Sequence, residues 1–232
     1  MPTPKRRAAE PAAEPAAPPP AAASEPVHAP LIFPVGHFTG GFPDADEPAE
    51  QAYHVRRGSE LVALPGDAFL VWGFAHGTPD HPQPWTRQEV FSQARSTGLD
   101  SVPQLVRDLG TAGLVAEVFP GTPAAREFAE THQAHPTLLG LGNTADDVGT
   151  FSIGLVGTPM LQVSRAIFEL WRWAPAAHNL WDVCQFFTEN ERAHGESDPE
   201  VTDPELLLTG YLGALHELLS GGAVYLDTAT GA

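Results

Sequence analysis

The feature that most constrains the fold is one order of elements that occurs twice along the chain. In the first half, a broken apolar stretch at residues 53–64 precedes three helix patterns and the apolar run 114–119. The second half repeats this order, from residues 151–163 through three helix patterns to the apolar run 223–226. Self-similarity of this kind indicates a supersecondary unit that is built more than once. We therefore expect two related repeats.

Residues with the same structural role recur in the two halves at three offsets. At 99 residues, Leu64, Phe69 and Trp72 correspond to Val163, Phe168 and Trp171. At 96 residues, Trp85 and Phe91 correspond to Trp181 and Phe187. At 109 residues, Val102, Val106, Leu109, Gly113 and Val115 correspond to Tyr211, Leu215, Leu218, Gly222 and Val224. The shared order of these pairs favours a true duplication over chance.

Turn and cap residues set the expected boundaries of the elements. Gly58-Ser59 divides residues 53–64 into a short hairpin. Thr86 and Glu89 have the spacing of a capping box at a helix N-terminus. Other side chains suited to cap a helix stand before the remaining helix patterns: Asp67, Ser101, Ser164, Asn179 and Asp203. The expected fold class is α+β but mainly helical, with each repeat formed by a hairpin, three helices and a strand, and the two repeats packed as one unit.

The segments around the repeats have different compositions. The first 30 residues contain 9 Pro and 10 Ala, so residues 1–30 are expected to be a disordered tail. Residues 31–50 are expected to form an arm on the domain, because exposure of Phe33, Phe38 and Phe42 would be costly. The boundaries of the repeats are then residues 51–120 and 151–232, with a linker at residues 121–150.

Two further sequence features bear on the compartment. No run of about 18 apolar residues occurs, so a membrane span is not expected. Proline and glutamate interrupt the first 23 residues where a secretory signal needs an apolar run, and the chain has a single cysteine. These features favour the cytoplasm.

The end of each third helix supports a resemblance. The sequence from Leu109 to Leu114 has the pattern Leu-x-x-x-Gly-Leu, and Leu218-Leu-Ser-Gly-Gly-Ala223 stands at the same place in the second repeat. Each half, roughly residues 51–119 and 151–227, resembles a winged helix-turn-helix domain. The first half is also similar to the PqqD-like peptide-recognition elements. This resemblance implies an extended peptide bound at the wing edge and the third helix, and it transfers no functional residue.

The charge balance limits the class of partner. The chain has 12 Lys and Arg against 29 Asp and Glu, a net charge of −17. Nonspecific nucleic-acid binding requires cations that neutralise phosphates, so an acidic body of this kind is poorly suited to it. The charge favours a basic protein or peptide partner, and it would also suit an acidic mimic of DNA that inhibits a DNA-binding protein.

DNA binding remains an alternative for the first repeat alone. Residues 51–120 have 5 cations and 7 anions, and Arg87, Arg95, Gln104 and Arg107 are the candidate contacts to DNA. The second repeat has 3 cations against 11 anions, so DNA binding is not expected there. In this alternative the chain is a homodimeric transcriptional regulator, although the residues themselves assign no oligomeric state.

The sequence does not favour an enzyme. It contains no G-x-S-x-G motif, no P-loop and no dinucleotide fingerprint, and Gly140 to Ala145 is better explained as a turn. Cys184 lies among apolar residues and is expected to be a buried, unreactive thiol. His132 and His135 have no nearby third ligand, so no metal and no cofactor are expected.

Protein or peptide binding is therefore the favoured function, as a non-catalytic adaptor or regulatory protein. Trp171 and Trp173 are two residues apart on one helix, so they cannot share a face. Trp173 then either packs between the repeats or contributes to a partner surface. An extended peptide would add to the edge of the last strand of the first repeat. The partner-binding candidates are Leu114, Val115, Glu117, Phe119 and Trp173.

Overall fold

The structure is a computed structural model that describes residues 29–43, 51–79 and 85–229. Helices make up 45% and strands 29% of the described residues, and the strands form four small sheets. The expectation of a mainly helical fold is therefore wrong, and the chain is α+β. The expected tail falls almost entirely on residues 1–28, which lie outside the described residues.

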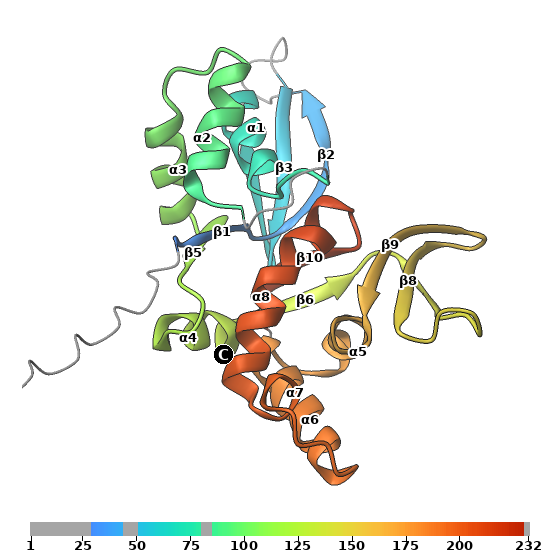
Figure 1. The fold of residues 1–232 in the computed structure, drawn as a ribbon. Coiled ribbons are helices and arrows are strands. Elements are labelled where there is room, and N and C mark those ends of the chain that lie inside the picture. The colour runs from blue at the N-terminus through green and yellow to red at the C-terminus, as the bar shows by residue number, and fades with distance from the viewer. Residues whose placement is uncertain (1–28, 44–50, 80–84, 230–232) are drawn as a thin grey trace, which may run out of the picture.

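The first half begins with a strand that pairs with the last strand of the same half. Strands β1 and β5 form an antiparallel pair, and β2, β3 and β4 form a separate antiparallel sheet in that order. Three helices lie between β4 and β5 (Figure 1). The elements are β1 (Leu31–Pro34), β2 (His37–Pro43), β3 (Gln51–Arg57), β4 (Glu60–Leu64), α1 (Gly66–Phe74), α2 (Arg87–Ser96), α3 (Val102–Thr111) and β5 (Val115–Val118).

The second half has the same order of main elements. After helix α4, strand β6 pairs with β10, and β7, β8 and β9 form an antiparallel sheet. Three main helices, α5, α6 and α8, lie between β9 and β10. The elements are α4 (Pro123–Thr131), β6 (His132–Pro136), β7 (Leu139–Gly142), β8 (Thr150–Leu155), β9 (Thr158–Ser164), α5 (Arg165–Trp173), η1 (Ala174–Ala176), α6 (Leu180–Ala193), α7 (Pro199–Thr202), α8 (Pro204–Ser220) and β10 (Val224–Thr228).

The segments expected to be an arm and a linker belong to the sheets. Residues 31–43 form β1 and β2, and residues 121–150 include α4, β6 and β7. Each expected hairpin forms the last two strands of a three-stranded sheet. The first strand of each sheet was not predicted from the sequence. Two glycines lie in β2 and two more in β7, and glycine is uncommon inside strands.

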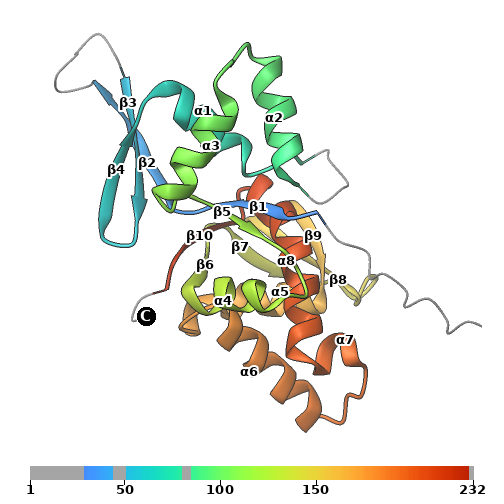
Figure 2. The same ribbon diagram turned by 90° about the vertical axis from the view of Figure 1, so that its left-hand side faces the viewer.

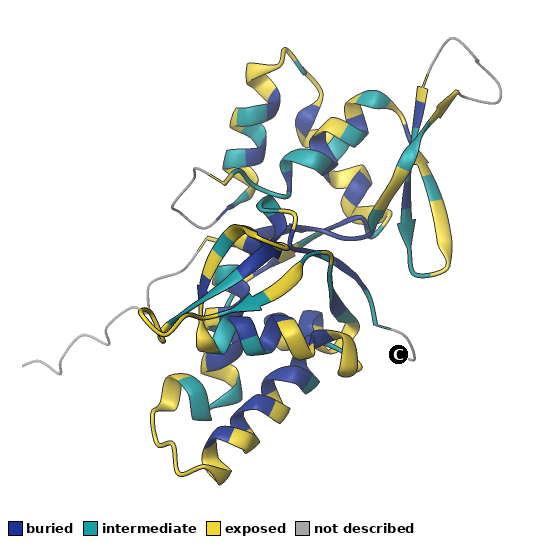
Figure 3. Cartoon of the chain, turned by 90° about the vertical axis from the view of Figure 1, so that its right-hand side faces the viewer, coloured by how far each residue is buried: buried dark blue, intermediate teal, exposed yellow. Residues whose placement is uncertain are grey.

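Strand β1 contributes side chains to two cores. Ile32 packs in the core of the first half, whereas Leu31 and Phe33 pack in the core of the second. Successive residues of a strand point to opposite faces, so one short strand can serve both cores. Figure 2 shows β1 and β5 between the helices of the two halves. Figure 3 shows the buried residues on the inner faces of these helices.

A second contact between the halves involves β10. The carboxylate of Asp227 is buried, accepts a 2.6 Å hydrogen bond from the Gly58 N–H and lies 3.0 Å from Arg56. The ring of Tyr225 stacks between His37 and His135, at centroid distances of 4.4 and 4.8 Å. The seam between the halves is therefore part polar and part aromatic.

The two halves share local geometry where the third helix ends. Gly113 and Gly222 have φ values of 67° and 65°, in the left-handed region that favours glycine. The Leu114 N–H donates to the Leu109 carbonyl at 2.9 Å, and the Ala223 N–H donates to the Leu218 carbonyl at 2.8 Å. These pairs fit the offset of 109 residues.

The offset of 96 residues does not fit the structure. The second helices are capped by Thr86 and Asn179, which are 93 residues apart. At this spacing the buried Val90 and Ala94 correspond to Val183 and Phe187, which are also buried. Trp85 and Trp181 are thus buried tryptophans at different positions relative to their helix caps.

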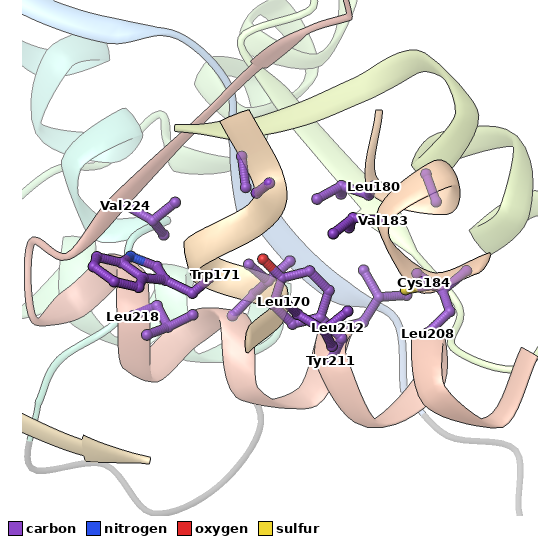
Figure 4. Close-up of a cluster of buried hydrophobic side chains, with 14 of the residues drawn as sticks. Leu170, Trp171, Leu180, Val183, Cys184, Leu208, Tyr211, Leu212, Leu218 and Val224 are labelled. Carbon is purple, nitrogen blue, oxygen red and sulfur yellow. The ribbon is translucent and has the colours of Figure 1, made fainter. Parts of the chain in front are cut away.

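The largest core surrounds α8. Figure 4 shows Trp171 beside Leu218 and Val224, and Tyr211 among the leucines of the same cluster. The Trp171 indole N–H donates to the Ala223 carbonyl at 2.9 Å. Within the described residues, no helix is long and apolar enough to cross a membrane.

Candidate functional site

Four of the candidate residues lie around one hollow on the surface of the first half. Arg87 begins α2, Arg107 lies on α3, and Val115 and Glu117 lie on β5. Together with Val106, Gly110 and Thr111, these residues line an open hollow of about 410 Å³. We call this hollow the α3–β5 groove. It brings together residues that the sequence had assigned to two alternative functions.

The backbone of β5 has one open edge along this groove. The Ile32 N–H donates to the Trp85 carbonyl at 3.1 Å, so the polar backbone groups of Ile32 point away from β5. Glu117 is opposite Ile32, and in an antiparallel pair the two residues of a non-hydrogen-bonded position both point their N–H and C=O outward.

The same alternation applies two residues earlier. Val115 is opposite Pro34, and proline has no N–H to donate to a ladder. Val115 and Glu117 therefore both direct backbone donors and acceptors away from β1. No other strand of the described chain pairs with β5.

The side chains along β5 differ in accessibility. Leu114 is fully buried and Val115 is buried, whereas Glu117 and Phe119 are exposed. Leu114, one of the partner-binding candidates, has its side chain in the core of the first half, so that side chain is not exposed at the groove. Val115 offers mainly its backbone to the groove.

The polar side chains beside the groove are partly engaged with one another. Arg87 donates two hydrogen bonds of 2.5 Å to the carboxylate of Glu117. Gln104 accepts from Arg107 at 2.6 Å and donates to Asp108 at 2.7 Å. Arg107 thus has an amide partner, but no carboxylate pairs with it among the described residues.

Arg95 lies apart from this group. It is on α2 and does not line the groove, and its guanidinium is 6.0 Å from the centre of the Phe91 ring. The four candidate contacts to DNA therefore do not form one continuous set.

A second hollow lies on the surface of the second half. It has a volume of about 260 Å³ and is lined by Trp173, Ala176, Ala177, Asp182, Val183 and Phe186. We call it the Trp173 pocket. Trp173 is 44% exposed and Phe186 is 57% exposed. The sequence left two positions open for Trp173, between the two halves or on the surface. The structure places it on the surface.

Sequence reasoning did not identify Phe186 as an exposed residue, although its ring lies on the surface. The buried residues Leu180, Val183, Cys184 and Phe187 have the i, i+3, i+4, i+7 spacing of one helix face, and position 186 falls outside it. The spacing of the apolar residues on this helix was therefore a signal for an exposed ring at position 186, as the spacing of Trp171 and Trp173 was for one of these two residues.

The residues considered for catalysis or metal binding are buried in the core or stacked on aromatic rings. Cys184 is fully buried, and burial raises the pKa of its thiol well above the ordinary range. His132 stacks on Phe128 and His135 stacks on Tyr225, and burial lowers the pKa of both imidazoles. The part of the chain that the structure describes contains no group of three or more His, Cys, Asp or Glu side chains that could hold a metal ion.

Comparison with protein-family models, with curated proteins and with solved structures finds no match to this chain.

Proposed function

We propose that this chain is a non-catalytic adaptor or regulatory protein that binds an extended peptide segment of a partner protein in the α3–β5 groove. The observation that carries the proposal is the open edge of β5, where the N–H and C=O groups of Val115 and Glu117 point away from β1. A peptide that adds as a strand gains main-chain hydrogen bonds from such an edge.

The second half offers an internal precedent for this mode of binding. Leu226 on β10 stands 109 residues after Glu117, and its carbonyl accepts a 2.7 Å hydrogen bond from the Gly36 N–H. The equivalent edge in the second half is therefore contacted by the backbone of the first half. In the first half, the corresponding position has no such partner among the described residues.

The groove also supplies chemistry for selectivity. Val106, Arg107 and Gly110 line the groove, and Arg107 has no carboxylate partner in the described structure. Arg107 suits a main-chain carbonyl or a carboxylate of the bound peptide. The net charge of −17 favours a partner that is basic outside the bound segment, because long-range attraction increases the association rate.

The contacts of the arginines favour this function over DNA binding. Arg87 is bound by Glu117 through two hydrogen bonds, and Gln104 is bound between Arg107 and Asp108. Reading of base edges needs such side chains free to form bidentate contacts with a base. The single buried thiol suits a reducing compartment, so we place this activity in the cytoplasm.

The test uses the full chain and peptides selected on it from a random dodecapeptide display library. We expect Glu117→Pro to weaken binding of the selected peptides about tenfold or more, because proline removes one outward N–H. The ladder to β1 uses Ala116 and Val118, so proline at position 117 leaves that pairing in place.

Glu117→Ala is the matched control. It removes the same ion pair with Arg87 but keeps the backbone N–H, so peptide affinity should change by less than about threefold. Equal affinities of the proline and alanine variants would contradict strand addition at β5. Retention of the wild-type chain on a DNA column, with elution that depends steeply on salt, would instead support the alternative function of a DNA-binding transcriptional regulator.

A further inference from the structure

We propose that the Trp173 pocket binds the proline-rich segment of this chain's own N-terminal region, residues 1–28, and that the contact forms within one molecule. The proposal is independent of the α3–β5 groove, because it concerns the opposite half of the molecule and different residues.

The pocket is an aromatic platform held in a fixed position. The Trp173 indole N–H donates to Glu169 at 3.0 Å, and the Arg172 guanidinium lies 5.1 Å from the centre of the Trp173 ring. The Phe186 ring is tilted by 61° from that of Trp173, at a centroid distance of 6.3 Å. Two exposed aromatic rings that meet at an angle form a slot with apolar walls.

Proline-rich segments are the class of ligand that such slots bind. A polyproline II segment docks on aromatic-lined grooves at a low entropic cost, because it is extended before it binds. Residues 1–28 contain eight prolines, including Pro15-Ala-Ala-Pro18 followed by Pro19 and Pro20. Two prolines at this spacing fall on one side of a helix with three residues per turn.

Charge complementarity fixes a direction for the bound segment. Lys5, Arg6 and Arg7 precede Pro15 by about 25 Å in a polyproline II conformation. The helix that carries Phe186 ends at Ala193, and the exposed carboxylates of Glu196, Asp198 and Glu200 follow it. The prolines therefore bind at Trp173 while the basic cluster lies toward this acidic segment.

The connection is long enough for the contact to form within one molecule. From Pro18 to Ala29, the first described residue, the chain has 11 residues, which extend about 34 Å in a polyproline II conformation. A folded domain of about 200 residues has a radius of gyration of about 17 Å. The connection is thus about twice this radius, and the mixed-sample control below tests whether the contact forms within one molecule.

The experiment places a nitroxide on the tail of the full chain. Cys184 is the single cysteine and is fully buried, so an Ala17→Cys variant accepts a thiol-reactive label at the new position. The indole N–H signals of the five tryptophans are then recorded by NMR. We expect the label to broaden the Trp173 signal nearly completely, while the signals of Trp72 and Trp85 in the first half stay sharp.

Variants separate the pocket from nonspecific proximity. Phe186→Ala, or Pro15→Ala combined with Pro18→Ala, should restore the Trp173 signal. Phe42→Ala removes an exposed ring from the first half and should leave the broadening unchanged. An unbroadened Trp173 signal, broadening of Trp72 and Trp85 instead, or broadening seen only between labelled and unlabelled chains in a mixed sample would overturn the proposal.

Discussion

Ile32 and Phe33 are neighbours in the sequence, yet their side chains belong to different cores. The apolar run at residues 31–33 is buried as expected, whereas Phe38 and Phe42, which the expected arm was also to shield, are 40% and 49% exposed. The run did not predict that the burial would be two-sided, because a run without polar residues is compatible with an arm lying on one surface. The partner of such a strand is a residue far along the chain, which no local pattern contains.

Exposed aromatic residues were predicted in part. The spacing of Trp171 and Trp173 indicated that one ring must leave the core, and Trp173 is exposed. Phe186, the second ring of the Trp173 pocket, lies outside the i, i+3, i+4, i+7 stripe of Leu180, Val183, Cys184 and Phe187, so the helical spacing could have identified it. The pocket itself depends on the packing of α5 against α6, which is a tertiary contact.

His216 makes stability depend on pH. Its Nε2 lies 2.7 Å from the Ile32 carbonyl, its ring stacks on Phe33, and its buried Nδ1 has no hydrogen-bond partner in the described chain. Burial lowers the pKa of His216 to about 4, against about 6.5 when unfolded. The unfolded chain therefore binds more protons between these pH values, so stability falls as the pH decreases through this range.

We predict that this one residue contributes about 2 kcal/mol to the loss of stability between pH 7 and pH 5. The measurement is urea unfolding at both pH values for the wild-type chain and His216→Gln. Glutamine can donate to the Ile32 carbonyl but does not titrate, so the pH dependence should shrink by about that amount. An unchanged dependence would show that other buried histidines, such as His76, account for it.

At the scale of elements, four of the six predicted helix caps are confirmed, whereas Asp67 lies inside α1, whose N-cap is Pro65, and Ser101 makes no capping hydrogen bond. Thr86, Ser164, Asn179 and Asp203 each accept hydrogen bonds from the backbone at the start of a helix, as predicted. A cap is a local interaction over three residues, so the sequence contains all of it. The glycine-rich strands β2 and β7 were missed because their pairing depends on neighbours that lie outside the segment.

Thr86 and Ser101 form a matched pair of predicted caps. Thr86 completes a capping box with Glu89, whereas the side chain of Ser101 makes no capping hydrogen bond. We predict that Thr86→Ala lowers the free energy of unfolding by about 1 kcal/mol and that Ser101→Ala changes it by less than about 0.5 kcal/mol. Urea unfolding at pH 7 measures both, and equal losses would contradict the assigned caps.

At the scale of the molecule, the repeated order of elements was visible in the sequence, but the way the halves meet was not. The seam joins β1, Arg56 and Gly58 of the first half to β10 of the second. Its central ion pair links residues that are 171 positions apart. A charged pair at such a separation has no sequence signature, because either residue alone is compatible with a solvated surface.

Asp227 tests the importance of this seam. We predict that Asp227→Ala lowers the free energy of unfolding by about 2–3 kcal/mol, since its charge-assisted hydrogen bonds to Arg56 and Gly58 are lost. Glu60→Ala removes an exposed ion pair with Arg57 and should cost less than about 1 kcal/mol. Similar costs for the two variants in urea unfolding would show that the seam contributes little.

The α3–β5 groove was also predicted only in part. The strand and its peptide-binding edge were expected from residues 114–119, but the pairing with β1 decides which backbone groups remain available. That pairing assigns the outward positions to Val115 and Glu117. Leu114, a sequence candidate, lies just before this strand, and its side chain is buried in the core of the first half.

The most direct test of strand addition is amide hydrogen exchange of the full chain, followed residue by residue by NMR. Without peptide, the Val115 and Glu117 amides should exchange faster than those of Ala116 and Val118, which pair with β1. With a saturating selected peptide, we predict that exchange at Val115 and Glu117 slows at least tenfold. Peptide binding that leaves both exchange rates unchanged would contradict binding at the β5 edge.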